Sequence, residues 1–146
     1  MKFYVANDHA GFSIKSDVIK ILKEKGCEIV DLGAASCERV DYPDFAHTLC
    51  EAVLKDNGSF GILICGSGIG MSIAANRHKG IRAALCHDAY TAKMARAHNN
   101  ANVLCFGERI SGLGVISSMI DAWINESFEG GRHAARVKKI EIQDGC

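Results

Sequence analysis

Five short apolar runs constrain this chain more than any other feature, because each is continuous rather than alternating. They cover residues 3–6, 29–32, 62–65, 83–86 and 103–106. Continuous runs of this length are typical of strands that are buried on both faces. Segments of helical period separate them, such as Ile14, Val18 and Leu22 between the first two runs. The repeated order of strand and helix predicts an α/β fold in three layers, α/β/α, with a five-stranded parallel sheet.

Length, charge and cysteine content exclude several classes of protein. The 146 residues predict a single domain over 1–146. The 17 Lys and Arg balance 17 Asp and Glu, so we expect no nucleic-acid partner. No stretch approaches 18 apolar residues, so we expect no membrane partner. The seven cysteines are dispersed without a C-x-x-C pair, which argues against disulfides or structural zinc and predicts a cytoplasmic protein with reduced thiols.

Candidate functional residues follow the apolar runs, because ligands of an open parallel sheet bind outside the carboxyl ends of its strands. Asp8 and His9 come after the first run and place a carboxylate and an imidazole at this edge. Asp8 can equally cap the following helix, and that alternative stays open. Arg109 follows the fifth run, where a surface arginine is the simpler interpretation.

A glycine-rich turn, CGSGIGMS, follows the third run and starts at Cys65. Its backbone N–H groups at a helix start suit an anion or a developing oxyanion. A cysteine that ends a buried strand is usually a small apolar residue, but beside a helix start its thiolate is favoured. A Walker loop needs a lysine that is missing here, and a dinucleotide fingerprint needs its third glycine where Met71 stands. Asp88 lies 20 residues beyond Gly68, so a nucleotide-binding module is weakened but stays open.

Further polar candidates lie later in the chain. His98 and Asn99 end a predicted helix, where they can serve in catalysis or simply cap the helix. Arg132 and Arg136 are four residues apart in a basic segment that we predict to be helical, with His133 between them. Like charges at this spacing destabilise an isolated helix, so an anion between the arginines would explain the pair. A solvated basic face is an equal alternative.

Together the candidates supply a thiol, backbone amides, a carboxylate, histidines and arginines, without metal-binding spacing or a cofactor fingerprint. These groups suit the abstraction of a proton next to a carbonyl on a small phosphorylated substrate. An aldose–ketose isomerisation needs no other group, so we expect no cofactor and no metal. The residues by themselves do not choose the sugar.

Five longer segments carry a more specific signal. They are DHAGF from Asp8, ERVDYPD from Glu38, CGSGIGMSIAAN from Cys65, HNNANVL from His98 and EGGRH from Glu129. In this order and spacing they closely resemble the type B ribose-5-phosphate isomerases, a family that also holds galactose-6-phosphate isomerase subunits. The similarity extends from Asp8 to Arg136.

The resemblance implies an enzyme that interconverts ribose 5-phosphate and ribulose 5-phosphate through a cis-enediolate, on a Rossmann-like sheet. The implied catalytic residues are Cys65 as the general base, Ser67 at the enediolate, and Asp8 and His98 for opening of the furanose ring. The implied substrate contacts are His9, Tyr42, Gly66, Gly68, Gly70, Asn99, Arg109, Arg132, His133 and Arg136.

The resemblance also implies a homodimer or tetramer, with an active site shared between subunits and a C-terminal helix that packs on a partner subunit. Another branch of the family has a glutamate base where Met71 stands, so this chain resembles the cysteine branch. Ser67 stands where threonine is frequent, which keeps the hydroxyl. The open alternatives are galactose 6-phosphate or allose 6-phosphate as substrate, a nucleotide-binding module, and a redox sensor centred on Cys65.

Overall fold

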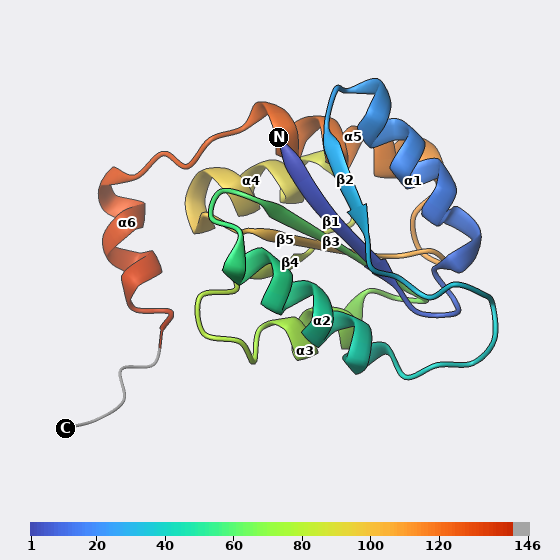
Figure 1. Ribbon diagram of the computed structural model, residues 1–146. Coiled ribbons are helices and arrows are strands. Elements are labelled where there is room, and N and C mark those ends of the chain that lie inside the picture. The colour runs from blue at the N-terminus through green and yellow to red at the C-terminus, as the bar shows by residue number, and fades with distance from the viewer. Residues whose placement is uncertain (142–146) are drawn as a thin grey trace.

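The five apolar runs form the strands of one sheet in the computed structural model, which describes residues 1–141 (Figure 1). The strands are β1 (Lys2–Asn7), β2 (Glu28–Asp31), β3 (Phe60–Cys65), β4 (Ala83–Leu85) and β5 (Val103–Gly107). The helices are α1 (Phe12–Glu24), α2 (Tyr42–Lys55), α3 (Ile69–Ala75), α4 (Ala89–Asn99), α5 (Leu113–Asn125) and α6 (Gly131–Lys138). The predicted strands are confirmed, and their ends differ from the apolar runs by at most two residues.

The sheet is parallel, with the strand order β2-β1-β3-β5-β4. Val5 pairs with Ile62 across β1 and β3, and Ile62 pairs with Leu104 across β3 and β5. From β1 the sheet grows toward β2, whereas from β3 it grows in the other direction toward β5 and β4. Because the direction of growth reverses between β1 and β3, a crevice opens at the carboxyl ends of these two strands.

Helices cover both faces of the sheet, which confirms the three-layer architecture (Figure 1). On one face α1, α4 and α5 enclose a core that contains Leu22 and Trp123. On the other face α2 and α3 enclose a second core that contains Leu49. Ile64 belongs to the first core and Cys65 to the second, because neighbours along a strand point to opposite faces. The side chain of Cys65 therefore lies on the face covered by α2 and α3.

Local signals account for several helix ends. α1 ends at Glu24, and Gly26 follows with a φ of +73°, a conformation that glycine adopts without strain. Pro43 lies in the first turn of α2, where no intrahelical N–H is needed. Asp88 caps α4, because its carboxylate accepts a 2.7 Å hydrogen bond from the backbone N–H of Thr91. This capping role explains Asp88 without a bound nucleotide.

Helix α6 stands apart from the sheet, beyond the end of α4 (Figure 1). Its buried residue is His133, which packs against α4 of the same chain, and the packing of α6 on a partner subunit stays a prediction. The six cysteines among the described residues are free, and Cys146 lies outside the described residues. Within residues 1–141, no helix has the length and apolar character needed to cross a membrane.

Candidate active site

A cavity of about 340 Å³ opens where β1, β3 and β5 end, next to the crevice between β1 and β3. Its lining residues are Asp8, His9, Ala10, Tyr42, Cys65, Gly66, Ser67, Gly70, Arg109 and Ile110. Eight of these ten are residues that the sequence predicted for the site, so the fold brings this part of the prediction together. The reason is geometric, because the carboxyl ends of parallel strands meet at one edge of the sheet.

Cys65 ends β3 and is only 5% exposed, but it lines the cavity and is not sealed within the core. The backbone N–H of Gly68 donates a 3.1 Å hydrogen bond to its Sγ atom. Gly68 has a φ of +78°, and a Cβ there would lie 2.6 Å from Leu85, so this turn requires glycine. An N–H that points at the sulfur stabilises negative charge there, as a proton-abstracting thiolate requires.

Asp8 follows β1 and is buried, with its Oδ1 accepting hydrogen bonds from the backbone N–H groups of Ala10 (2.9 Å) and Gly11 (3.1 Å). These bonds close a turn before α1, whose N-cap is Gly11, so Asp8 shapes the turn instead of capping the helix. The ring of His9 is oriented by Val40, whose N–H donates to Nδ1 at 3.3 Å. The neutral ring of His9 therefore carries its proton on Nε2, where it can donate to an anion.

Arg109 and Tyr42 border the cavity from two other elements. Arg109 follows β5, and a Cβ added at Gly66 would lie 3.2 Å from its guanidinium. Tyr42 begins α2, and a Cβ added at Gly70 would lie 2.6 Å from its ring. These two glycines let a cation and a phenol approach the turn that starts at Cys65. The cavity thus combines a thiol, a carboxylate, an imidazole and a guanidinium, which suits a small anionic substrate.

Gly68 belongs to the turn at Cys65 although it does not line the cavity, and the remaining predicted residues lie at the opposite end of the sheet. α4 starts beyond the carboxyl end of β4 and runs back, so His98 and Asn99 at its end lie near the start of β5. The same end holds the predicted residues of α6, which are Arg132, His133 and Arg136. One chain therefore divides the predicted site between the two ends of its sheet.

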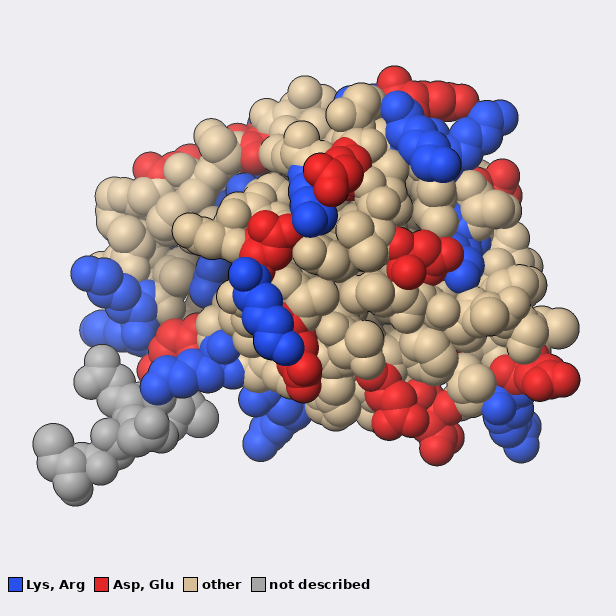
Figure 2. Space-filling view, viewed as in Figure 1, with Lys and Arg blue, Asp and Glu red and all other residues tan. Residues whose placement is uncertain are grey.

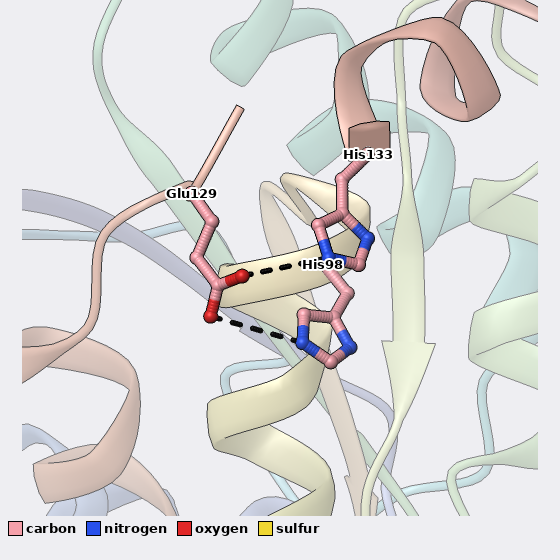
Figure 3. Close-up of side chains that lie close together, drawn as sticks. All are labelled: His98, Glu129 and His133. Carbon is pink, nitrogen blue, oxygen red and sulfur yellow. Dashed lines mark ion pairs between the residues drawn. The ribbon is translucent and has the colours of Figure 1, made fainter. Parts of the chain in front are cut away.

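His98 and His133 stack at this second end, with ring centroids 4.2 Å apart and ring planes that differ by 6° (Figure 3). The carboxylate of Glu129 faces both rings, with Oε2 3.4 Å from Nε2 of His133 and Oε1 3.8 Å from Nε2 of His98. Burial lowers the pKa of His133, and the nearby His98 and Arg132 lower it further, whereas Glu129 acts in the opposite direction. Glu129 begins the segment EGGRH, but no role for it could be predicted from the sequence. Its spacing of four residues from His133 was the available signal.

The same three side chains offer metal-ligand atoms that all lie within 4.8 Å of one another. An imidazole binds a metal along the lone pair in its ring plane. The ring planes of His98 and His133 are stacked and nearly parallel. A single metal ion therefore cannot lie in both ring planes while it is close to a nitrogen of each ring. The positive charges of Arg132 and Arg136 also act on His133, and they oppose the binding of a cation there. The geometry therefore does not fit a metal centre.

A larger cavity of about 500 Å³ lies between the α3–β4 connection and the last described residues. It is lined by Asn76, Arg77, His78, Lys79, Ile81, Ile140 and Glu141. None of these is a predicted site residue, and the group contains no thiol next to a backbone amide donor. We therefore take the smaller cavity at Cys65 as the candidate active site.

Comparison with known proteins places this geometry in a family. The sequence model of the ribose/galactose isomerases matches residues 3–140. The chain belongs to the ribose/galactose isomerase family. Ribose-5-phosphate isomerase B of Escherichia coli (strain K12) is 47% identical over 133 residues, which cover 91% of this chain and 89% of that protein. The resemblance found in the sequence is confirmed.

Solved structures show the same fold. Ribose-5-phosphate isomerase B of Clostridium thermocellum has a TM-score of 0.93 at 47% identity, covering 96% of this chain and 95% of that chain. The type B ribose 5-phosphate isomerase of Trypanosoma brucei has a TM-score of 0.92 at 48% identity, covering 95% of each chain. Together with the family match, these relatives show that the chain is an isomerase.

Proposed function

We propose that this member of the family interconverts ribose 5-phosphate and ribulose 5-phosphate through a cis-enediolate, without a cofactor. The observation that carries the proposal is the Cys65 sulfur, which lines a cavity and accepts the N–H of Gly68. Asp8, His9 and Arg109 line the same cavity, whose volume of about 340 Å³ suits a small sugar phosphate. The relatives named as ribose-5-phosphate isomerases support this substrate.

The reaction would begin with opening of the furanose ring. Asp8 and His98 are the two groups proposed for this step, one removing the proton of the C1 hydroxyl and the other giving a proton to the ring oxygen. The bond between C1 and the ring oxygen breaks, and an aldehyde forms at C1. Because two groups act as acid and base, no net proton is consumed.

The Cys65 thiolate would then remove the proton from C2, and the electron pair of that bond forms the C1–C2 double bond of the enediolate. The Ser67 hydroxyl and the N–H groups of residues 66–70 would hold the negative oxygen. The proton on O2 passes to O1, the thiol returns its proton to C1, and C2 becomes the ketone. The thiolate is thereby restored.

A second copy of the chain would complete this site. His98 and Asn99 end α4 at the opposite end of the sheet from Cys65, so they cannot enter the cavity of their own chain. Exposed apolar side chains border the cavity or lie on the adjoining α3, which supports an interface there. These are Tyr42, Ile69, Ile73 and Ile110, with exposed fractions between 40% and 63%.

The anchor for the phosphate would come from α6 of the second copy. Arg132 and Arg136 are both exposed on this helix. Figure 2 shows Lys and Arg side chains over α6, whereas both signs of charge are interspersed over much of the same face. Paired guanidinium groups suit a phosphate that must be held away from the reacting carbons.

Galactose 6-phosphate and allose 6-phosphate are the competing substrates, because the matching family includes galactose isomerases. Initial rates of purified protein with ribose 5-phosphate and both hexose phosphates, measured in the presence of a chelator, would decide among them. We expect ribose 5-phosphate to give the highest kcat/KM. A higher value with either hexose phosphate would overturn the pentose assignment.

The role of Cys65 has a direct test. We expect Cys65→Ala to lower kcat about 10²- to 10⁴-fold, because it removes the general base. Cys37→Ala is the matched control, since Cys37 is free and exposed and does not line the cavity. An unchanged rate in Cys65→Ala would contradict the proposed base.

We also propose that the protein works in the cytoplasm. The free state of the six described cysteines supports a reducing compartment. The equal numbers of acidic and basic residues give no reason to add a nucleic-acid partner.

A further inference from the structure

Glu129 lies in the connection between α5 and α6, where its carboxylate faces two histidines (Figure 3). Its two oxygens divide between the rings, one 3.4 Å from Nε2 of His133 and the other 3.8 Å from Nε2 of His98. These distances exceed those of good hydrogen bonds, so the interaction is mainly electrostatic. One carboxylate therefore acts on both members of the stacked pair.

The backbone of Glu129 is fastened to the helix that carries His98. Its N–H donates a 3.0 Å hydrogen bond to the carbonyl of Ala97, the residue before His98. Gly130 follows with a φ of +67° and turns the chain into α6, which brings His133 onto His98. The backbone that carries the carboxylate is thus fixed by the hydrogen bond to α4 and by the turn into α6.

We propose that Glu129 is a positioning residue for His98, holding its Nε2 side so that Nδ1 exchanges the proton with the sugar during ring opening. The inference rests on the proposed function, in which His98 takes part in that step. Stacking on His133 restricts the plane of the His98 ring, and the carboxylate decides which edge turns toward the protein. A ring held in one orientation loses less entropy on reaching the transition state.

The charges around the pair explain why a carboxylate is needed. Arg132 and Arg136 from α6 act on His133 with the same sign, and so does His98 when it is protonated. Among the groups that act on His133, Glu129 is the one of opposite sign. Without Glu129, the described charged groups that act on the His133 ring would all be positive.

Ring opening can be separated from proton transfer between the two carbons by the choice of substrate. Ribose 5-phosphate rests mainly as a furanose, which must open before it reacts. Ribulose 5-phosphate cannot close a five-membered ring, because the oxygen on C5 carries the phosphate. Removal and return of a C1 proton of ribulose 5-phosphate therefore need no ring opening, and they are measured as deuterium exchange into ribulose 5-phosphate in D2O. A residue that serves ring opening should matter for the net conversion and much less for this exchange, whereas the equilibrium constant ties the two directions of the net conversion together.

The test compares Glu129→Gln, Glu129→Ala and Glu129→Asp in the assembled enzyme, with initial rates from ribose 5-phosphate and with deuterium exchange into ribulose 5-phosphate. We expect Glu129→Ala and Glu129→Gln to lower kcat/KM for ribose 5-phosphate about 10- to 100-fold, the range found for carboxylates that orient metal-binding histidines. The rate of deuterium exchange into ribulose 5-phosphate should change less than about threefold, and Glu129→Asp should retain part of the activity that Glu129→Ala loses. Equal losses of net turnover and of deuterium exchange would overturn the proposal.

The matched control is Glu126→Gln, which removes a carboxylate from the same connection. Glu126 pairs with Lys93 at 3.5 Å and not with either histidine of the stacked pair. We expect wild-type rates from this variant. Titration of the His133 ring by NMR adds a second readout, because loss of Glu129 should lower the pKa of His133 further. An unchanged titration in Glu129→Gln would show that the carboxylate does not act on the pair.

A double-mutant cycle separates positioning from general structural damage. In the His98→Asn background, Glu129→Ala should cause almost no further loss, because the group that it positions is gone. Independent, multiplicative losses would overturn the inference. If the wild-type enzyme itself shows no turnover of either pentose phosphate, the proposed function fails instead, so the two failures are distinguishable.

Discussion

The two ends of the sheet are built in different ways. At the carboxyl end, Cys65 and Asp8 are nearly buried and each accepts at least one backbone N–H. At the amino end, His98 is partly exposed and is held by ring stacking and a carboxylate, while Arg132 and Arg136 are exposed. The difference teaches that the groups closest to the proposed proton transfer are fixed within one chain, whereas the remaining groups are more exposed, as their proposed use by a second copy requires.

The largest predicted effect is the return of activity when two inactive variants, one altered at each end of the sheet, form a mixed dimer. Cys65→Ala and His98→Asn should each be nearly inactive toward ribose 5-phosphate, because each removes one end of the shared site. In a mixed dimer, one site would combine intact Cys65 with intact His98, and the other would lack both. Random mixing after unfolding and refolding would make half of the dimers mixed, so about a quarter of wild-type activity should return.

The control for this experiment is a mixture of Cys65→Ala with itself, carried through the same refolding. Activity that stays at the level of the single variants would mean that both ends act within one chain or that His98 has no role. Size-exclusion chromatography would confirm that the refolded species is an oligomer.

A smaller effect compares one glycine from each end. Gly68 and Gly26 both have positive φ, but a Cβ at Gly68 would lie 2.6 Å from Leu85, whereas a Cβ at Gly26 would meet nothing within 4 Å. We expect Gly26→Ala to cost about 1 kcal/mol of unfolding free energy and Gly68→Ala about 2–4 kcal/mol. Urea unfolding measures both.

Gly68→Ala should also lower activity, because the displaced turn moves the N–H away from the Cys65 sulfur. Gly26→Ala should leave kcat unchanged, since α1 ends far from the cavity. Equal destabilisation by the two substitutions would mean that the turn after β3 adapts to a side chain and does not require glycine at position 68.

The smallest effect is the response of the amino end to pH. The pKa of His133 is lowered from its ordinary value of 6.5, so the unfolded chain binds more protons than the folded chain as the pH falls below that value. The contribution of this group to stability is therefore present above pH 6.5 and is lost as the pH falls through the folded pKa. The melting temperature of the wild type should fall more between pH 7 and pH 5 than that of His133→Gln, and identical slopes would contradict this.

Much of the fold could be predicted because its signals are local. The strand around Ile62 is a continuous apolar run because both of its faces are buried. The helix around Val18 has apolar residues at helical spacing because one of its faces is buried. The order of the strands could not be predicted. It depends on which side of the sheet each crossover helix packs, and that is decided by contacts between residues distant in sequence.

The candidate site was predictable to the extent that its residues follow strands. Asp8, Cys65 and Arg109 come directly after β1, β3 and β5, and parallel strands bring these positions to one edge. The grouping of His98 with Glu129 depends instead on how the last segment of the chain folds back onto α4, which no local pattern encodes.

The sequence by itself determined that this chain forms a layered α/β sheet with a thiol and a glycine turn at one edge, because strand and helix periods and turn residues act over a few positions. Only the tertiary structure decided that Gly68 directs its N–H at Cys65, that the predicted residues divide between two ends of the sheet, and that a glutamate faces the stacked histidines. Those features arise from packing and electrostatics between distant segments, which act only once the chain has folded.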